Sequence, residues 1–240
     1  MKLRFRRNVG LCALALGTLA LGVTLSPSKA QNPEMQQRIA EVKEDAARNK
    51  QLLAQYTWVE QVTISLKGEQ KKEEHFQIRL GPDGKPQKTS LDPPPAPPEH
   101  EGRLKKHIVE KKTEEYKEYA DQIKALIQQY VPPEKDLIEQ ARQKGNIMLV
   151  PAAGAVGEYR LVFSNYLKQG DNMTLVLDKT RKDLVSLSIA TYLSDPSDTV
   201  NVSVTFSQVP SGPNHVSGET INGVSKQLTI AIQNNNYQLM

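Results

Sequence analysis

The C-terminal part of the chain alternates apolar and polar residues with the two-residue period of a β-strand. The clearest run is 199–207, in which valine or phenylalanine alternates with threonine, asparagine or serine. Because successive side chains of a strand point to opposite faces, this pattern predicts a sheet with one apolar and one polar face. The same alternation recurs in four further runs, at 159–163, 173–177, 185–189 and 228–232. Together they predict an antiparallel meander.

Turn residues separate these runs at the spacing expected of hairpins. Gly170-Asp171 is one such turn, and Asn222-Gly223 is the turn predicted before the last run. Asn-Gly adopts the positive backbone angles that tight hairpin turns require. The spacing therefore predicts consecutive, directly connected strands.

The segment before the meander changes its period once. Apolar residues recur every three or four positions over 34–56, which predicts an amphipathic helix. Two-residue alternation then predicts strands at 58–66 and 75–80, and a weaker strand follows near 88–91. This segment should therefore add one helix and three strands to the fold.

A proline-rich loop and a helical block connect these two parts. Residues 92–99 contain five prolines, which favours an extended spacer, with a recognition sequence for a proline-binding module as the alternative. Residues 111–145 form a helical insertion. An apolar stripe over 116–130 predicts one helix, and a Pro-Pro pair separates it from a second, shorter helix.

A sheet with one apolar face must close on itself or be covered. Three amphipathic helices are available as a cover. We therefore predict an α+β fold in which a curved antiparallel sheet of eight or nine strands, an incomplete half-barrel, is covered by amphipathic helices. A closed outer-membrane barrel fits poorly, because aromatic girdles are missing and helices interrupt the strands. Residues 31–240 are expected to form a single domain.

The N-terminus has the pattern of an export signal. Four bases at positions 2–7 precede an uncharged apolar run over 9–26, and Ser28 and Ala30 supply the small residues that signal peptidase requires. We expect a signal peptide over 1–30, cleaved after Ala30, and a periplasmic location. Retention as an inner-membrane anchor is the alternative, since an uncharged run of this length can just cross a bilayer.

Charge and motif content favour a binding protein. Five of the 31 Lys and Arg residues lie in the leader, which has no acid, so the other 26 face 27 Asp and Glu. No nucleic-acid partner is therefore expected. The single cysteine, Cys12, lies in the leader, the four histidines lack metal-ligand spacing, and no nucleophile elbow or phosphate loop occurs. We expect no catalytic activity, metal or cofactor. A carboxylate pair that meets only in the fold is the remaining enzymatic alternative.

Two segments give the chain a family resemblance. Residues 47–60, where the predicted helix runs into a strand, and 175–187, a strand–turn–strand unit, are similar to the corresponding parts of the periplasmic lipoprotein carriers of the LolA/LolB type. The resemblance covers about residues 34–233. It implies a half-barrel, roofed by helices, that holds acyl chains.

We therefore expect an exported, noncatalytic binder or carrier of a hydrophobic ligand, such as a lipid, an acyl chain or an acylated protein. The alternative is an envelope scaffold or accessory protein with a filled core, which docks other envelope proteins through the charged helix and the proline loop. The apolar alternation and the helical stripe predict which residues line the ligand cavity. From the sheet these are Trp58, Ile64, Phe76, Ile78, Phe163, Leu175 and Phe206, and from the roof Tyr119, Ile123 and Ile127.

Overall fold

The computed structural model describes residues 47–93, 103–152, 157–210 and 212–240. The predicted signal peptide, the first part of the 34–56 helix and most of the proline-rich loop lie outside these residues. A short helix at 47–53 precedes the first strand. The elements that follow are β1 (Tyr56–Leu66), β2 (Glu69–Leu80), β3 (Pro86–Ser90), α2 (Arg103–Ile127), α3 (Lys135–Gln143), β4 (Ile147–Pro151), β5 (Glu158–Ser164), β6 (Asn172–Asp178), β7 (Leu184–Tyr192), β8 (Thr199–Gln208), β9 (Asn214–Gly223) and β10 (Leu228–Leu239).

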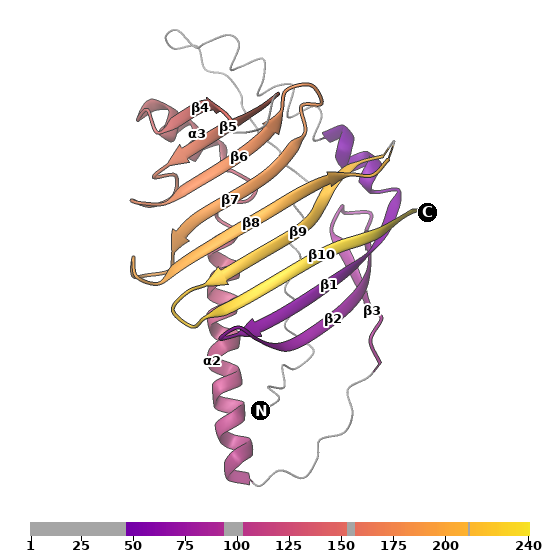
Figure 1. Ribbon diagram of the computed structural model, residues 1–240, viewed down its shortest axis with the longest axis vertical. Coiled ribbons are helices and arrows are strands. Elements are labelled where there is room, and N and C mark those ends of the chain that lie inside the picture. Colours follow the sequence, from indigo (N-terminus) through magenta and orange to yellow (C-terminus); the bar gives the residue numbers. More distant parts are fainter. Residues whose placement is uncertain (1–46, 94–102, 153–156, 211) are drawn as a thin grey trace.

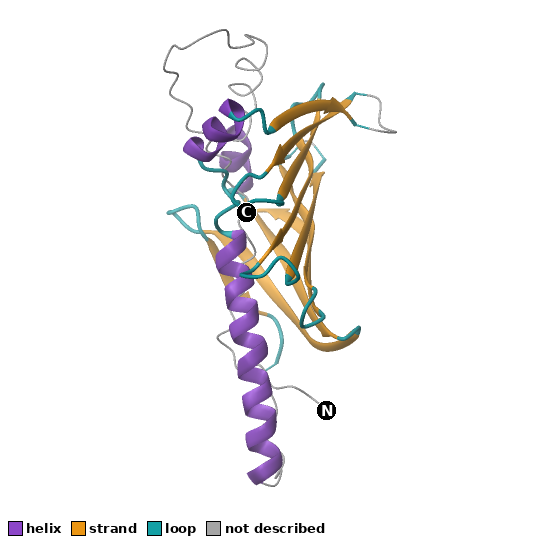
Figure 2. Ribbon diagram, turned by 90° about the vertical axis from the view of Figure 1, so that its left-hand side faces the viewer, coloured by secondary structure: helices purple, strands orange, loops and turns teal. Residues whose placement is uncertain are grey.

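All ten strands belong to one antiparallel sheet (Figure 1). Their order is β3-β2-β1-β10-β9-β8-β7-β6-β5-β4, so β3 and β4 form the two edges and the sheet is open. The helices lie on one side of the sheet (Figure 2). The predicted α+β class, an incomplete half-barrel covered by helices, is confirmed, with ten strands in place of eight or nine.

The pairing of β1 with β10 joins the two strand regions of the chain. It runs from Tyr56 opposite Leu239 to Leu66 opposite Leu228, with an irregularity between Thr57 and Val59. Because β1 also pairs with β2, the N-terminal strands extend the C-terminal meander rather than forming a second sheet. Figure 1 shows β1, in indigo, beside β10, in yellow.

The side of the sheet that packs against the helices is called the inner face below. In β8, Val200, Val202 and Val204 are buried there, whereas the residues between them are mostly exposed. The predicted alternation of this strand is therefore confirmed. Burial of such side chains is the main source of stability for a covered sheet.

Helix α2 crosses the inner face closely at the end of β9. A Cβ atom at Gly223 would lie 2.5 Å from Cε1 of Tyr119 and 2.7 Å from Cδ1 of Ile123. Glycine therefore permits the close approach of helix and strand. Among the described residues, no helix combines the length and apolar character needed to cross a bilayer.

Two strands, β4 and β9, were not predicted, and one predicted turn is wrong. Asn222 and Gly223 are the last residues of β9, and the turn to β10 lies at 224–227. Strand β9 lacks apolar alternation because two of its buried positions hold His215 and Glu219. Strand β4 is a short edge strand without alternation, and its Met148 side chain is exposed.

Candidate functional site

The ten residues predicted to line a cavity lie in the interior of the protein. Eight are buried, and Phe76 and Phe206 are partly buried. A single apolar cluster, called the main core below, includes six of them: Ile64, Tyr119, Ile123, Ile127, Phe163 and Leu175. Phe76 and Phe206 pack against the main core, whereas Trp58 and Ile78 are buried apart from it. A role of these residues in ligand binding stays a prediction.

Buried hydrogen bonds join the segment after α2 to the loop between β5 and β6 and to β7. Tyr130 is fully buried, and its hydroxyl donates to Oδ2 of Asp171 at 2.6 Å and lies 2.7 Å from the hydroxyl oxygen of Thr191. Burial, together with the hydrogen bond to Asp171, raises the pKa of Tyr130 above its ordinary value. Both hydroxyls thus have partners, as buried polar groups require.

Asp171 organises the loop between β5 and β6. Its carboxylate accepts hydrogen bonds from the backbone N–H groups of Tyr166 at 2.6 Å and of Leu167 and Lys168 at 2.9 Å. With the Tyr130 hydroxyl added, both carboxylate oxygens are satisfied. Asp171 is therefore a structural residue.

The opposite end of the inner face is aromatic and polar. The rings of Trp58 and Tyr237 stack with centroids 5.3 Å apart and an interplanar angle of 13°. The ring of His215 lies 3.9 Å from that of Tyr237. Trp58 Nε1 donates to Oδ1 of Asn234 at 3.1 Å, and the Asn234 amide donates to the carbonyl of Val216 at 3.0 Å. These contacts bridge β1, β10 and β9.

The bridge is needed because β9 separates from β10 at this end. The last paired residues of the two strands are Gln233 and Gly218. The helix at 47–53 reaches the same end, where Asn49 and Asn214 exchange two hydrogen bonds of 2.6 Å. The start of β9 is therefore held by its pairing with β8, by the side-chain bridge to β10 and by this helix.

Two buried carboxylates lie between this end and the main core. Glu60 of β1 is opposite Asn234 of β10, and Glu219 of β9 is opposite Ile232 of β10. They therefore flank β10, two residues apart along it. The exposed fraction is 0% for Glu60 and 3% for Glu219.

One lysine faces the two carboxylates. Lys88, from the edge strand β3, forms an ion pair with Oε1 of Glu60, and its Nζ lies 5.4 Å from the ring centre of Phe76. Among the described residues, three buried side-chain atoms have no hydrogen-bond partner, and these are Oε2 of Glu60, Oε1 of Glu219 and Nδ1 of His215. Glu60, Glu219 and Lys88 are called the buried carboxylate cluster below.

The electrostatics of this cluster follow from its burial. Burial first, and then the nearby charge of Glu60, raise the pKa of Glu219 to about 8, although Lys88 acts in the opposite direction. Burial also raises the pKa of Glu60, against the opposing effect of Lys88. The pKa of His215 is lowered because burial disfavours the charged imidazole. Both carboxylates therefore hold a proton more readily than exposed carboxylates do.

Sequence reasoning missed this cluster although a signal was present. Glu60 shares the inward-facing alternate positions of its strand with Trp58 and Val62, where the alternation predicts an apolar residue. Glu219 could not be found in the same way, because β9 itself was not recognised. The fold alone brings these two side chains together.

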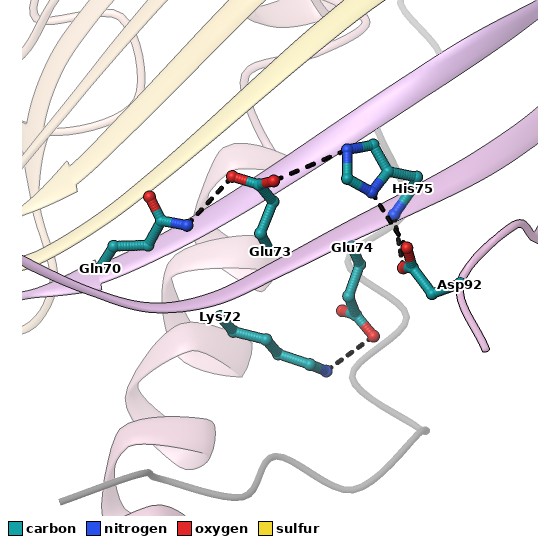
Figure 3. A network of polar contacts seen from close by, with 6 residues as sticks. All are labelled: Gln70, Lys72, Glu73, Glu74, His75 and Asp92. Atoms are coloured by element: carbon teal, nitrogen blue, oxygen red, sulfur yellow. Dashed lines mark hydrogen bonds and ion pairs between the residues drawn. The ribbon is translucent and has the colours of Figure 1, made fainter. Parts of the chain in front are cut away.

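A second polar network lies on β2, where it is partly exposed (Figure 3). The His75 backbone N–H donates to Oδ2 of Asp92 at 2.7 Å, and its Nδ1 lies 3.0 Å from Oδ1. Burial would raise the pKa of Asp92, but hydrogen bonds from His75 outweigh it and the pKa is lowered. Lys72 and Glu74 form a separate ion pair of 2.8 Å. The network ties the chain after β3 to β2.

No group of three or more potential metal-ligating side chains occurs among the residues that the structure describes. No model of a known protein family matches the chain, and no curated protein is similar to it in sequence. Among solved structures, a DUF1329 family protein from Desulfovibrio piger is 12% identical, with a TM-score of 0.41 over 84% of this chain and 93% of that one. A LolA superfamily protein from Nitrosomonas europaea is 8% identical, with a TM-score of 0.38 and the same two coverages.

Proposed function

We propose that the chain is an exported, noncatalytic protein that binds or carries a hydrophobic ligand on the inner face of its sheet. The observation that supports this most is the extent of the buried apolar surface. It continues beyond the main core to Trp58 and Ile78, at the end that carries the aromatic pair and the buried carboxylate cluster. A fold that needed only a core would not require this second, partly polar region.

An acyl chain is the ligand that such a face suits. Each methylene group transferred from water to an apolar surface contributes about 0.8 kcal/mol, so a chain of ten carbons can bind tightly without polar contacts. Phe76 and Phe206 are partly buried where they pack against the main core. They are the predicted residues best placed to contact both the core and an incoming chain.

The second candidate is an envelope scaffold or accessory protein with a filled core. The complete burial of Tyr130 and Met173, both 0% exposed, favours this interpretation for the end covered by α2. In that case the inner face would serve stability alone. Partner proteins would then bind elsewhere on the surface.

The export part of the proposal depends on the leader at 1–30. Residues 31–240 would follow as a single domain in the periplasm. The nearly balanced charge of this part is consistent with a protein that does not bind nucleic acid.

Lipid extraction and mass spectrometry of the exported protein test the proposal. We expect a bound lipid or fatty acid in stoichiometric amount, absent from an unrelated exported protein purified in parallel. If no lipid copurifies and the protein gives no response to a fluorescent fatty acid, the filled-core reading replaces the carrier.

A further inference from the structure

The charges of the buried carboxylate cluster are not explained by the packing of the inner face. On β6 and β8 the buried inward positions are all apolar. Glu60 and Glu219 lie among such positions, almost without exposure to solvent. A buried ionised carboxylate is strongly unfavourable unless a charge and hydrogen-bond donors compensate it.

The cluster has fewer donors and less positive charge than two ionised carboxylates require. Lys88 contacts Oε1 of Glu60, whereas Oε2 of Glu60 and Oε1 of Glu219 have no partner. When both carboxylates are ionised, two negative charges face one lysine. In that state the cluster offers two free acceptors and one uncompensated negative charge, which a donor of charge +1 would satisfy.

A primary ammonium group meets both requirements, because it carries one charge and three N–H donors in a compact head. A metal ion is a poor alternative, because the described residues contain no group of three metal-ligating side chains. An anionic head group is also a poor alternative, because it would be repelled by the two carboxylates, and Lys88 is already paired with Glu60. We propose that Glu60 and Glu219 bind the primary ammonium group of an amphiphilic ligand whose apolar chain lies on the inner face. This inference rests on the proposed function and adds the class of head group to it.

The groups around the cluster are compatible with a cation. His215 is held in its neutral form by burial, so it does not repel an ammonium group at neutral pH. Tyr237 is likewise neutral, because burial raises its pKa and the charge of Glu60 adds to the effect. Among the residues that the structure describes, Lys88 is the positive side chain in contact with the cluster, and it is paired with Glu60.

Binding should also move a proton. With its pKa raised to about 8, Glu219 is protonated in the free protein at neutral pH. An ammonium group that arrives beside it favours the ionised carboxylate, so one proton passes from Glu219 to water when the ammonium–carboxylate pair forms. Charge inside the protein is then balanced, with two carboxylates against Lys88 and the ligand.

The single tryptophan provides the assay. Trp58 stacks on Tyr237 beside the cluster, so its emission should respond when a ligand enters. The intact exported protein is titrated at neutral pH with three amphiphiles of equal chain length, namely decylammonium, 1-decanol and decanoate. We expect decylammonium to bind most tightly. In Glu219→Gln its affinity should fall about 10- to 100-fold, the range of one charge-assisted hydrogen bond, while the affinity for decanol stays unchanged.

Glu74→Gln is the matched control. Glu74 of β2 is opposite Val62 of β1, and its carboxylate is paired with Lys72, so its loss should leave all three affinities unchanged. Three outcomes would contradict the inference: equal binding of the three amphiphiles, tightest binding of decanoate, or a preference for decylammonium that persists in Glu219→Gln. In each case Glu219 is neutralised by a proton and does not bind an ammonium group. The inference is then overturned while the carrier proposal stands. If none of the amphiphiles binds to the wild-type protein, both are overturned.

Discussion

Glu219→Gln should change the pH dependence of folding stability. The carboxyl group is 3% exposed, and its pKa rises from an ordinary value of 4.5 to about 8 in the folded protein. The folded state therefore binds this proton more tightly than the unfolded state does. Its contribution to stability is complete below pH 4.5 and is lost as the pH rises towards 8.

The magnitude follows from the difference between the two pKa values. At about 1.4 kcal/mol per pKa unit, the wild-type protein loses roughly 3 kcal/mol of stability from this group between pH 4.5 and pH 7. The loss reaches roughly 5 kcal/mol above pH 8. Glutamine has the same shape and does not titrate, so the variant should gain this amount over the wild type as the pH rises.

Urea unfolding at a series of pH values between 4.5 and 8 measures the effect. Comparison of the two proteins at each pH cancels contributions common to both, including that of His215, whose lowered pKa acts with the opposite sign below its ordinary value of 6.5. Glu118→Gln, on the exposed side of α2, controls for the loss of one carboxylate. If Glu219→Gln and wild type keep the same difference in stability across the series, Glu219 is not a buried, protonated group and the reasoning fails.

Three further predictions follow from the fold and the leader. Phe206→Ala should destabilise the protein by less than the roughly 3–5 kcal/mol expected of a fully buried phenylalanine, because Phe206 is only partly buried. The same variant should weaken fluorescent-lipid binding. A large loss of stability with unchanged binding would remove Phe206 from the ligand site. Gly223→Ala should cost about 1–3 kcal/mol in urea unfolding, because its Cβ would lie 2.5 Å from a ring atom of Tyr119. Gly218→Ala, whose Cβ would meet Oγ1 of Thr205 at 3.0 Å, should cost less, and equal costs would contradict the close helix crossing. N-terminal sequencing of exported protein should begin at Gln31, and an intact Met1 in the membrane fraction would indicate an anchor instead.

Strands whose inner face is apolar could be predicted from the sequence, because alternation records which side is buried. Strand β8 shows this, since each of its three valines is buried as expected. The apolar stripe of α2 likewise predicted Tyr119, Ile123 and Ile127 as buried residues. In these elements, local pattern and tertiary packing require the same residues.

The candidate site could not be predicted in the same way, because its residues break the pattern. Strand β9 has histidine and glutamate at buried positions, so no alternation marked it as a strand. The pairing of β1 with β10, which places Glu60 and Glu219 on either side of one strand, is a contact between the two ends of the described chain. Neither composition nor periodicity specifies such a distant pairing. Polar residues at inward positions were thus the one usable signal.

Energy transfer from Trp58 to a fluorescent fatty acid tests the central proposal, ligand binding on the inner face, most directly. Trp58 is the only tryptophan and is buried on that face, so efficient transfer requires the ligand to lie nearby. The proposal predicts saturable transfer at one ligand per protein, which unlabelled fatty acid of the same length abolishes by competition. Transfer that is absent, or that rises linearly without competition, would contradict the proposal and leave the inner face as a filled core.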